Sequence, residues 1–126
     1  MSTAVQYKLP IKIFILNNQY MGMVRQWQEL LHEKNYSESY TAALPDFVKL
    51  AEAYGCVGIQ ATKPDELDEK INEMININEP VIFDCRVDPA ENCFPMIPSG
   101  KPHNQMLLGP SDEKKNKITT KGKVLV

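Results

Sequence analysis

Two consecutive asparagines, Asn17 and Asn18, stand where a short apolar segment meets a helix-forming one. The preceding residues 11–16 are apolar in five of six positions, which is typical of a strand buried on both faces of a parallel sheet. The following residues begin an amphipathic helix, whose N-terminus offers backbone N–H groups and the positive end of a dipole. An anion, or a cation bound to phosphate, could therefore bind at this turn.

The same asparagines also suit a purely structural role. Asparagine is a favoured N-cap residue, and a turn from strand to helix needs polar residues in any case. Spacing alone leaves both interpretations open, because two asparagines after a strand form an unspecific pattern.

The helix expected over residues 21–33 bears directly on this possible site. Its apolar residues recur at helical spacing, and they are Met23, Val24, Trp27, Leu30 and Leu31. The pattern places the polar residues on the opposite side, namely Arg25, Gln26, Gln28 and Glu29. Core packing is the simpler interpretation of Met23 and Trp27, but their place in the first two turns also allows them to line a pocket.

The composition is that of an ordinary globular domain. Of the 126 residues, 43% are hydrophobic and 24% are charged, which suffices for one domain with a core of its own. The net charge of -2 gives no electrostatic reason to expect nucleic acid or an anionic membrane as a partner. Because no transmembrane run or secretory signal is recognisable, a cytoplasmic location is expected.

The cysteines and histidines give little sign of a metal site. Cys56, Cys85 and Cys93 lack the spacing of a zinc site or of a disulfide framework, so buried free thiols are expected. His32 falls near the end of a helix, where a cation suits the dipole, and is expected to be structural or solvated. The lysine-rich C-terminal run has no interleaved aromatic residues, which favours a solvated tail over a nucleic-acid site.

Helical and strand patterns alternate along the chain and predict an α/β fold. We expect helices over residues 1–7, 21–33 and 45–55, strands over 11–16, 56–61 and 81–88, and a further helix that ends before Pro80. Strands separated by helices predict a parallel sheet. The last strand alternates in its second half, which places it nearer an edge.

Helix signals refine two of these elements. Pro45 suits the first position of its helix and Gly55 suits the residue after the end. Thr62 can cap the next helix, with Asp65 three residues on. The apolar stripe of that helix comprises Leu67, Ile71, Met74 and Ile75.

The predicted domain covers residues 1–110 and includes a proline-rich, extended tail over 89–110. Residues 111–126 are polar and are expected to be loosely ordered. The first helix has no visible beginning, so we expect the chain to be a fragment of a longer protein or a truncated reading frame.

One run of residues resembles a known family. Residues 16–28 read Leu-Asn-Asn-Gln-Tyr-Met-Gly-Met-Val-Arg-Gln-Trp-Gln, with Pro-Asp-Phe at 45–47 and Pro-Met at 95–96. They resemble the C-terminal part of the catalytic subunit of acetolactate synthase (acetohydroxyacid synthase), a thiamine diphosphate-dependent enzyme family. The resemblance covers residues 1–109, and it implies a partial thiamine diphosphate-binding fold truncated at its N-terminus.

This resemblance implies an activity. Members of the family use thiamine diphosphate and Mg2+ to decarboxylate pyruvate and to join the two-carbon unit to a second 2-oxo acid, pyruvate or 2-oxobutyrate. The products lead to the branched-chain amino acids isoleucine, valine and leucine. The resemblance also implies a homo-oligomer, a regulatory small subunit as partner, and FAD bound by a domain outside this chain.

The resemblance also implies roles for individual residues. The side chain of Asn18 and the backbone carbonyl of Tyr20 would be Mg2+ ligands. Gly22 and Met23 would contact the cofactor, while Met23, Val24 and Trp27 would line the substrate pocket. Trp27 would help to select the acceptor 2-oxo acid, and the tail around residues 95–106 would form a lid that excludes water.

This chain also departs from the family. No Gly-Asp-Gly segment precedes Asn18, and the family's activating glutamate lies outside the chain, so no catalytic residue is assigned here. We therefore expect the isolated chain to be inactive, and to associate through apolar surface on its first strand. The alternatives are another thiamine diphosphate-dependent carboligase, decarboxylase or oxidase, or a non-catalytic assembly module.

Overall fold

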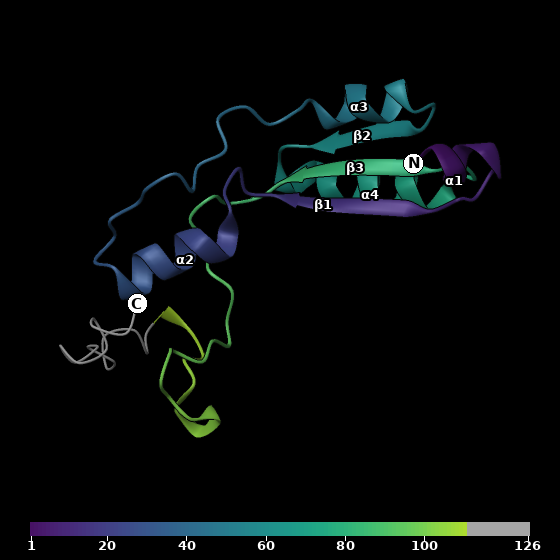
Figure 1. Ribbon diagram of the computed structural model, residues 1–126. Helices are drawn as coiled ribbons and strands as arrows, with labels where there is room; N and C mark the ends of the chain where they lie inside the picture. Colours follow the sequence, from purple (N-terminus) through teal and green to yellow (C-terminus); the bar gives the residue numbers. More distant parts are fainter. Residues whose placement is uncertain (111–126) are drawn as a thin grey trace. The chain divides into compact units, whose positions relative to one another are not determined.

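The computed structural model describes residues 1–110, and its elements follow the expected alternation (Figure 1). They are α1 (Ser2–Gln6), β1 (Lys12–Asn17), α2 (Gly22–Leu31), α3 (Phe47–Ala53), β2 (Val57–Ala61), η1 (Pro64–Glu66), α4 (Leu67–Asn76), β3 (Val81–Arg86) and η2 (His103–Gln105). The loosely ordered tail predicted over 111–126 lies outside the described residues. None of the described helices is long and apolar enough to cross a membrane.

The described chain forms two compact units. The sheet unit comprises residues 1–20 and 41–90, and the helix–tail unit comprises residues 21–40 and 91–110. The single domain predicted over 1–110 stays a prediction.

The sheet unit contains a parallel three-stranded sheet in the order β1-β3-β2. Val81 of β3 pairs with Lys12 of β1 on one side and with Val57 of β2 on the other. The α/β fold class predicted from the alternation is confirmed.

The prediction that the last strand lies nearer an edge is wrong, because β3 is the central strand and residues 81–85 are all buried. The alternation was misleading at Asp84, whose carboxylate is buried among polar partners and does not face solvent.

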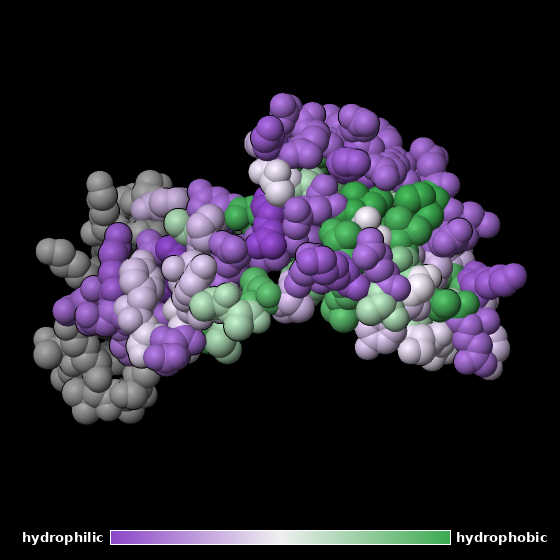
Figure 2. Space-filling view, turned by 90° about the horizontal axis from the view of Figure 1, so that it is seen from above, coloured by the Kyte–Doolittle hydropathy of each residue, from purple (hydrophilic) through white to green (hydrophobic). Residues whose placement is uncertain are grey.

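Strand β1 differs from its prediction in the opposite sense. The burial expected on both faces is absent, because β1 lies at the edge of the described sheet. Phe14 and Leu16 are 39% and 68% exposed. On the face seen in Figure 2, hydrophobic side chains reach the surface of the sheet unit between hydrophilic ones. The apolar composition of β1 therefore exceeds what the described residues cover, as expected for a strand without its second neighbour.

Two hydrophobic clusters hold helices on the two faces of the sheet. One joins Phe83 and Val81 to the α4 residues Leu67, Ile71 and Met74. The other joins Ile82 to residues of α1 and α3, among them Val5, Phe47 and Ala51. Because successive strand residues point to opposite faces, α4 covers one face while α1 and α3 cover the other. Ile75, predicted on the apolar stripe of α4, is exposed instead.

Two helix starts differ from their predictions. Asp46 is the N-cap of α3, so Pro45 precedes the cap and does not occupy the first helical position. The Asp46 carboxylate accepts the N–H groups of Lys49 and Val48 at 3.1 Å, and these bonds lower its pKa. Gly55, with φ 75°, ends the helix as predicted.

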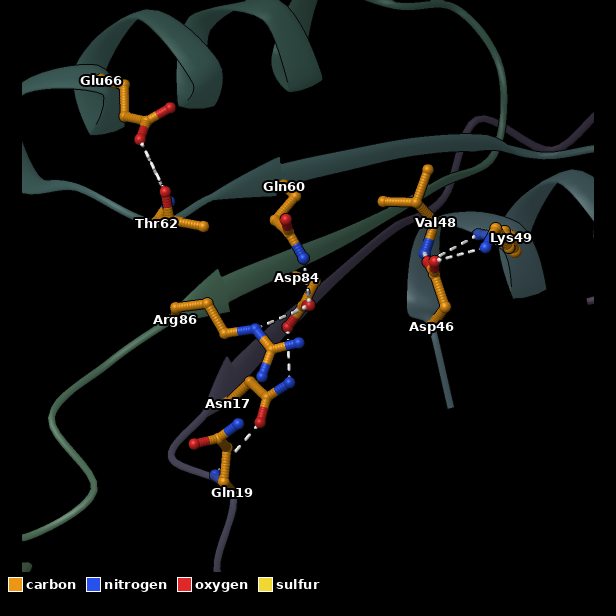
Figure 3. Close-up of polar contacts among 10 residues, drawn as sticks. All are labelled: Asn17, Gln19, Asp46, Val48, Lys49, Gln60, Thr62, Glu66, Asp84 and Arg86. Atoms are coloured by element: carbon orange, nitrogen blue, oxygen red, sulfur yellow. Dashed lines mark hydrogen bonds and ion pairs between the residues drawn. The ribbon is translucent and has the colours of Figure 1, made fainter. Parts of the chain in front are cut away.

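Thr62 does not cap α4, because the 3-10 turn η1 intervenes. The Thr62 hydroxyl and N–H instead donate to the Glu66 carboxylate at 3.1 and 3.3 Å (Figure 3). These bonds lower the pKa of Glu66, with the hydroxyl bond as the largest cause. The carboxylate that pairs with Thr62 is thus Glu66 and not Asp65.

In the helix–tail unit, α2 turns its polar residues inward. Arg25 and Gln26 are 7% and 6% exposed, whereas Met23 is 77% exposed. The predicted polar face is thus the buried one at these two positions, because both side chains find polar partners. The proline-rich tail contains several turns, the short helix η2 and one antiparallel bridge between Met96 and Leu107, and its extended course stays a prediction.

Candidate functional site

The turn after β1 is held by both asparagine side chains. The Asn17 Oδ1 atom accepts the N–H of Gln19 at 3.1 Å, and the Asn18 Oδ1 atom accepts the N–H of Tyr20 at the same distance. Gln19 adopts φ 60°, in the left-handed region of backbone conformation that residues other than glycine seldom occupy. The two side chains thus support a turn of unusual backbone conformation at the carboxyl end of the sheet.

Backbone bonds fix the same turn to neighbouring segments. The Asn17 carbonyl accepts the N–H of Val87 at 3.2 Å, and the Gln19 carbonyl accepts the N–H of Thr41 at 2.9 Å. The first bond joins the turn to the residue after β3. The second joins it to the loop before α3, so the chain here is held from two sides.

A pocket of about 170 Å³ opens beside this turn, entirely within the sheet unit. Its lining comprises the end of β1, the turn and the approach to α3, namely Ile15, Leu16, Asn17, Asn18, Gln19, Tyr20, Thr41, Leu44 and Phe47. Parallel sheets of α/β proteins bind their ligands at the carboxyl ends of strands, and the pocket lies at that place on β1.

A polar cluster on the α3 side of the sheet completes the site. The buried Asp84 carboxylate accepts the Asn17 amide at 2.7 Å and the Gln60 amide at 2.9 Å, and the Arg86 guanidinium lies 3.2 Å away (Figure 3). Asn17, Asp84 and Gln60 come from three different strands. Sequence reasoning missed this cluster, although an aspartate inside the apolar run 81–85 was a signal for it.

Residues 1–85 match the family model described as the C-terminal TPP-binding domain of thiamine pyrophosphate enzymes. The chain belongs to the thiamine pyrophosphate enzyme family. Residues 1–85 form part of that domain, as predicted from the resemblance.

Curated relatives narrow the similarity. The chain is 44% identical to the acetolactate synthase large subunit of Haemophilus influenzae, over 92% of this chain and 20% of the relative. It is 48% identical to that of Cyanidium caldarium, over 85% and 18%. It is 44% identical to the isozyme 3 large subunit of Escherichia coli, over 89% and 20%. The chain thus spans about a fifth of the length of these relatives.

Among solved structures, the chain resembles the thiamine diphosphate-dependent 4-hydroxybenzoylformate decarboxylase of Rhodococcus jostii RHA1. The TM-score is 0.61 at 28% sequence identity, and the match covers 69% of this chain and 16% of the decarboxylase. The fold shared with that decarboxylase supports the assignment of the sheet unit to the thiamine pyrophosphate enzymes.

The residues at the turn fit the divalent ion implied for a thiamine pyrophosphate enzyme. An asparagine side-chain oxygen and a backbone carbonyl are the oxygen donors that Mg2+ prefers, and Mg2+ takes few such donors from protein. Within residues 1–110, no group of three or more His, Cys, Asp or Glu side chains could hold a metal by itself.

Helix α2 presents the predicted pocket residues on its exposed side. Met23, Val24 and Trp27 are 77%, 42% and 39% exposed, and Gly22 begins the helix. The interpretation of Met23 and Trp27 as core residues is therefore wrong. Their role in lining a pocket stays a prediction, which exposed apolar side chains at the start of a helix favour.

The opposite side of α2 is bound to the tail, within the helix–tail unit. The Gln26 carboxamide donates to the Cys93 carbonyl at 2.9 Å and accepts the Cys93 N–H at 2.8 Å. Its Nε2 atom also lies 3.0 Å from the Met96 sulfur. Arg25 forms an ion pair with Glu29 at 2.7 Å and donates to Asn92 at 3.0 Å.

The thiols follow their prediction in part. Cys56 and Cys85 are buried free thiols, but Cys93 is exposed. Burial raises the pKa of the Cys85 thiol, and the neighbouring Asp84 carboxylate adds to this effect.

Proposed function

We propose that the chain is the C-terminal part of an acetolactate synthase large subunit. Such an enzyme decarboxylates pyruvate and joins the two-carbon unit to pyruvate or 2-oxobutyrate. The observation that carries the proposal is the run Gly-Met-Val-Arg-Gln-Trp at 22–27 placed directly after the asparagine turn, in a chain 44–48% identical to three acetolactate synthase large subunits.

Asn18 and the Tyr20 carbonyl are proposed to hold Mg2+, and through it the diphosphate of the cofactor. Thiamine diphosphate supplies, when bound, the electron sink that decarboxylation of a 2-oxo acid requires. The turn contributes fixed oxygen donors, since Asn17, Val87 and Thr41 all restrain its backbone. Preorganised donors lose little entropy when the ion binds.

Met23, Val24 and Trp27 are proposed to line the substrate pocket, with Gly22 and Met23 next to the cofactor. The broad indole face of Trp27 would sense the extra methylene of 2-oxobutyrate. Apolar contact with one methylene discriminates by about 1 to 3 kcal/mol. Trp27 therefore adjusts the choice of acceptor and does not dictate it.

The proposal extends to the assembly and location of the enzyme. A regulatory small subunit is proposed as partner, because the relatives are named large subunits. A homo-oligomer and cytoplasmic action complete the proposal. The isolated chain would bind thiamine diphosphate weakly, since it offers two oxygen donors, and a low-micromolar dissociation constant by calorimetry would contradict this.

A chimaera tests the activity. Residues 1–109 of this chain replace the matching residues of the Escherichia coli isozyme 3 large subunit, and acetolactate formation from pyruvate is measured against Mg2+ concentration. We expect acetolactate, and we expect Asn18→Ala to raise the Mg2+ requirement by about tenfold or more, the usual scale for loss of a metal-site residue.

Asn76→Ala, a change at the exposed end of α4, is the matched control and should leave the Mg2+ requirement unchanged. A soluble, assembled chimaera that makes no acetolactate would overturn the proposed activity. Acetaldehyde in place of acetolactate would indicate a decarboxylase. An unchanged Mg2+ requirement in Asn18→Ala would remove Asn18 from the metal site.

A further inference from the structure

The function proposed above assigns no role to Asp84, which lies in the central strand of the sheet. Among residues 1–110 it is the buried carboxylate, with no exposed surface. Its strand β3 lies between β1 and β2. The last residue of β3, Arg86, pairs with Asn17, where the asparagine turn begins. A buried charge is costly unless hydrogen bonds and an opposite charge compensate it.

The two oxygens of this carboxylate have different partners. Oδ2 receives the Gln60 amide at 2.9 Å and faces the Arg86 guanidinium at 3.2 Å. Oδ1 receives the Asn17 amide nitrogen at 2.7 Å. The cation and the Gln60 amide thus compensate one side of the charge, while the other side is directed at Asn17.

The contact with Oδ1 fixes which way the Asn17 carboxamide points. An asparagine side chain has one donor end and one acceptor end. With its nitrogen bound to the carboxylate, its oxygen must face away, and there it accepts the Gln19 N–H at 3.1 Å (Figure 3). A reversed amide would place oxygen against the carboxylate and nitrogen against the Gln19 N–H, and would lose both bonds.

We propose that Asp84 is a positioning residue, which sets the turn of residues 17–20 through the Asn17 carboxamide. The turn needs such support, because Gln19 adopts φ 60°, a conformation that persists only where the surroundings enforce it. Fixing Gln19 sets the directions of the Asn18 side chain and of the Tyr20 carbonyl, which flank it. This last step rests on the proposed function, in which these two groups bind the ion.

A gain in stability is a weak explanation of the cluster. Replacing a buried ion pair by apolar residues is often neutral or stabilising, so such a pair is weak evidence for a stabilising role. A positioning role instead predicts a local effect at Gln19, which can be separated from an effect on the whole sheet.

An exchange of the carboxylate at 84 and the carboxamide at 17 provides the test. In Asp84→Asn, the Arg86 cation attracts the new amide oxygen, so the amide nitrogen faces Asn17 and the Asn17 amide must reverse. In the double variant Asn17→Asp with Asp84→Asn, the amide at 84 donates to the carboxylate at 17, whose second oxygen can again accept the Gln19 N–H. Gln60→Ala, which touches only Oδ2, is the matched control.

The measurement is hydrogen exchange of the Gln19 amide by NMR in the 126-residue chain, without cofactor, relative to the Phe83 amide inside the sheet. We expect Asp84→Asn to speed Gln19 exchange about five- to tenfold relative to Phe83, the effect of losing one hydrogen bond. Gln60→Ala should leave this ratio unchanged, and the double variant should restore it to within about twofold.

A Gln19 rate that follows the Phe83 rate in every variant would overturn the proposal. A double variant that folds but leaves the Gln19 amide unprotected from exchange would also overturn it. This second result tests the proposal even if Asp84→Asn does not fold. The outcome is independent of the proposed function, because no metal is present. If the chimaera forms no acetolactate but the Gln19 amide exchanges as expected in the variants, the proposed activity is overturned and the positioning role of Asp84 stands.

Discussion

At the scale of single residues, the three free thiols should differ in reactivity. The thiolate is the reactive form, and Cys85 is buried with a raised pKa, whereas Cys93 is exposed. We predict that iodoacetamide at about pH 8 modifies Cys93 first, and Cys85 only after unfolding. Mass spectrometry of peptides after timed quenching measures this order, and urea-unfolded chain is the control. Equal rates in the folded chain would contradict the burial of Cys85.

The contribution of Cys85 to folding stability changes with pH in a definite direction. Its pKa is higher in the folded chain than in the unfolded one, so the folded state holds the proton more tightly. The resulting stability is fully present below the ordinary thiol pKa and is lost as the pH rises through the raised pKa. Alkaline unfolding of Cys85→Ser should therefore depend less steeply on pH.

The residues of the site were predictable from sequence only in part. The polar turn at Asn17 and Asn18 could be located, because a strand, a polar pair and a helix follow one another along the chain. Asp84 lies 67 residues from Asn17, and their hydrogen bond arises from parallel pairing of β1 with β3. No local pattern could show which strands would become neighbours.

At the scale of elements, Gln26 joins α2 to the tail by two hydrogen bonds to one backbone position. We predict that Gln26→Leu releases residues 92–96, since leucine can neither donate to the Cys93 carbonyl nor accept its N–H. Limited proteolysis should then cleave this segment at least several-fold faster than in the wild type.

Gln28→Leu is the matched control for the loss of the Gln26–Cys93 hydrogen bonds. Gln28 lies on the same helix, and its amide donates to the Ser37 carbonyl and not to the tail. Cleavage between 92 and 96 should stay at the wild-type rate in this variant. Equal acceleration in both variants would show that general loss of helix stability, and not the Gln26–Cys93 hydrogen bonds, controls access of the protease to the tail.

The type of each element could be predicted from period and composition, but its environment could not. Helix α2 shows why, because its buried Gln26 is hydrogen-bonded to Cys93, 67 positions away in the sequence. Strand β3 gives the converse case, since a central strand tolerates Asp84 only with partners from two other strands. Burial of polar groups depends on such distant pairing.

At the scale of the whole molecule, β1 leaves apolar side chains and one backbone edge uncovered by the described residues. We predict that the isolated chain associates as its concentration rises, because unpaired strand edges and apolar patches invite pairing. Sedimentation velocity over a range of concentrations measures this.

Ile13→Lys places a charge on β1 and should shift the distribution towards monomer, while Lys70→Ala on the far helix α4 should leave it unchanged. A wild-type chain that sediments as a monomer at all concentrations would show that β1 does not drive association.

The hydrogen bonds between Gln26 and the backbone of Cys93 also have an evolutionary consequence. Both of these hydrogen bonds to position 93 end on main-chain atoms, so any amino acid that keeps an N–H can stand there. A change at position 26, in contrast, has no counterpart at 93 that could compensate for it. Related chains should therefore vary freely at position 93, proline excepted, while glutamine persists at position 26.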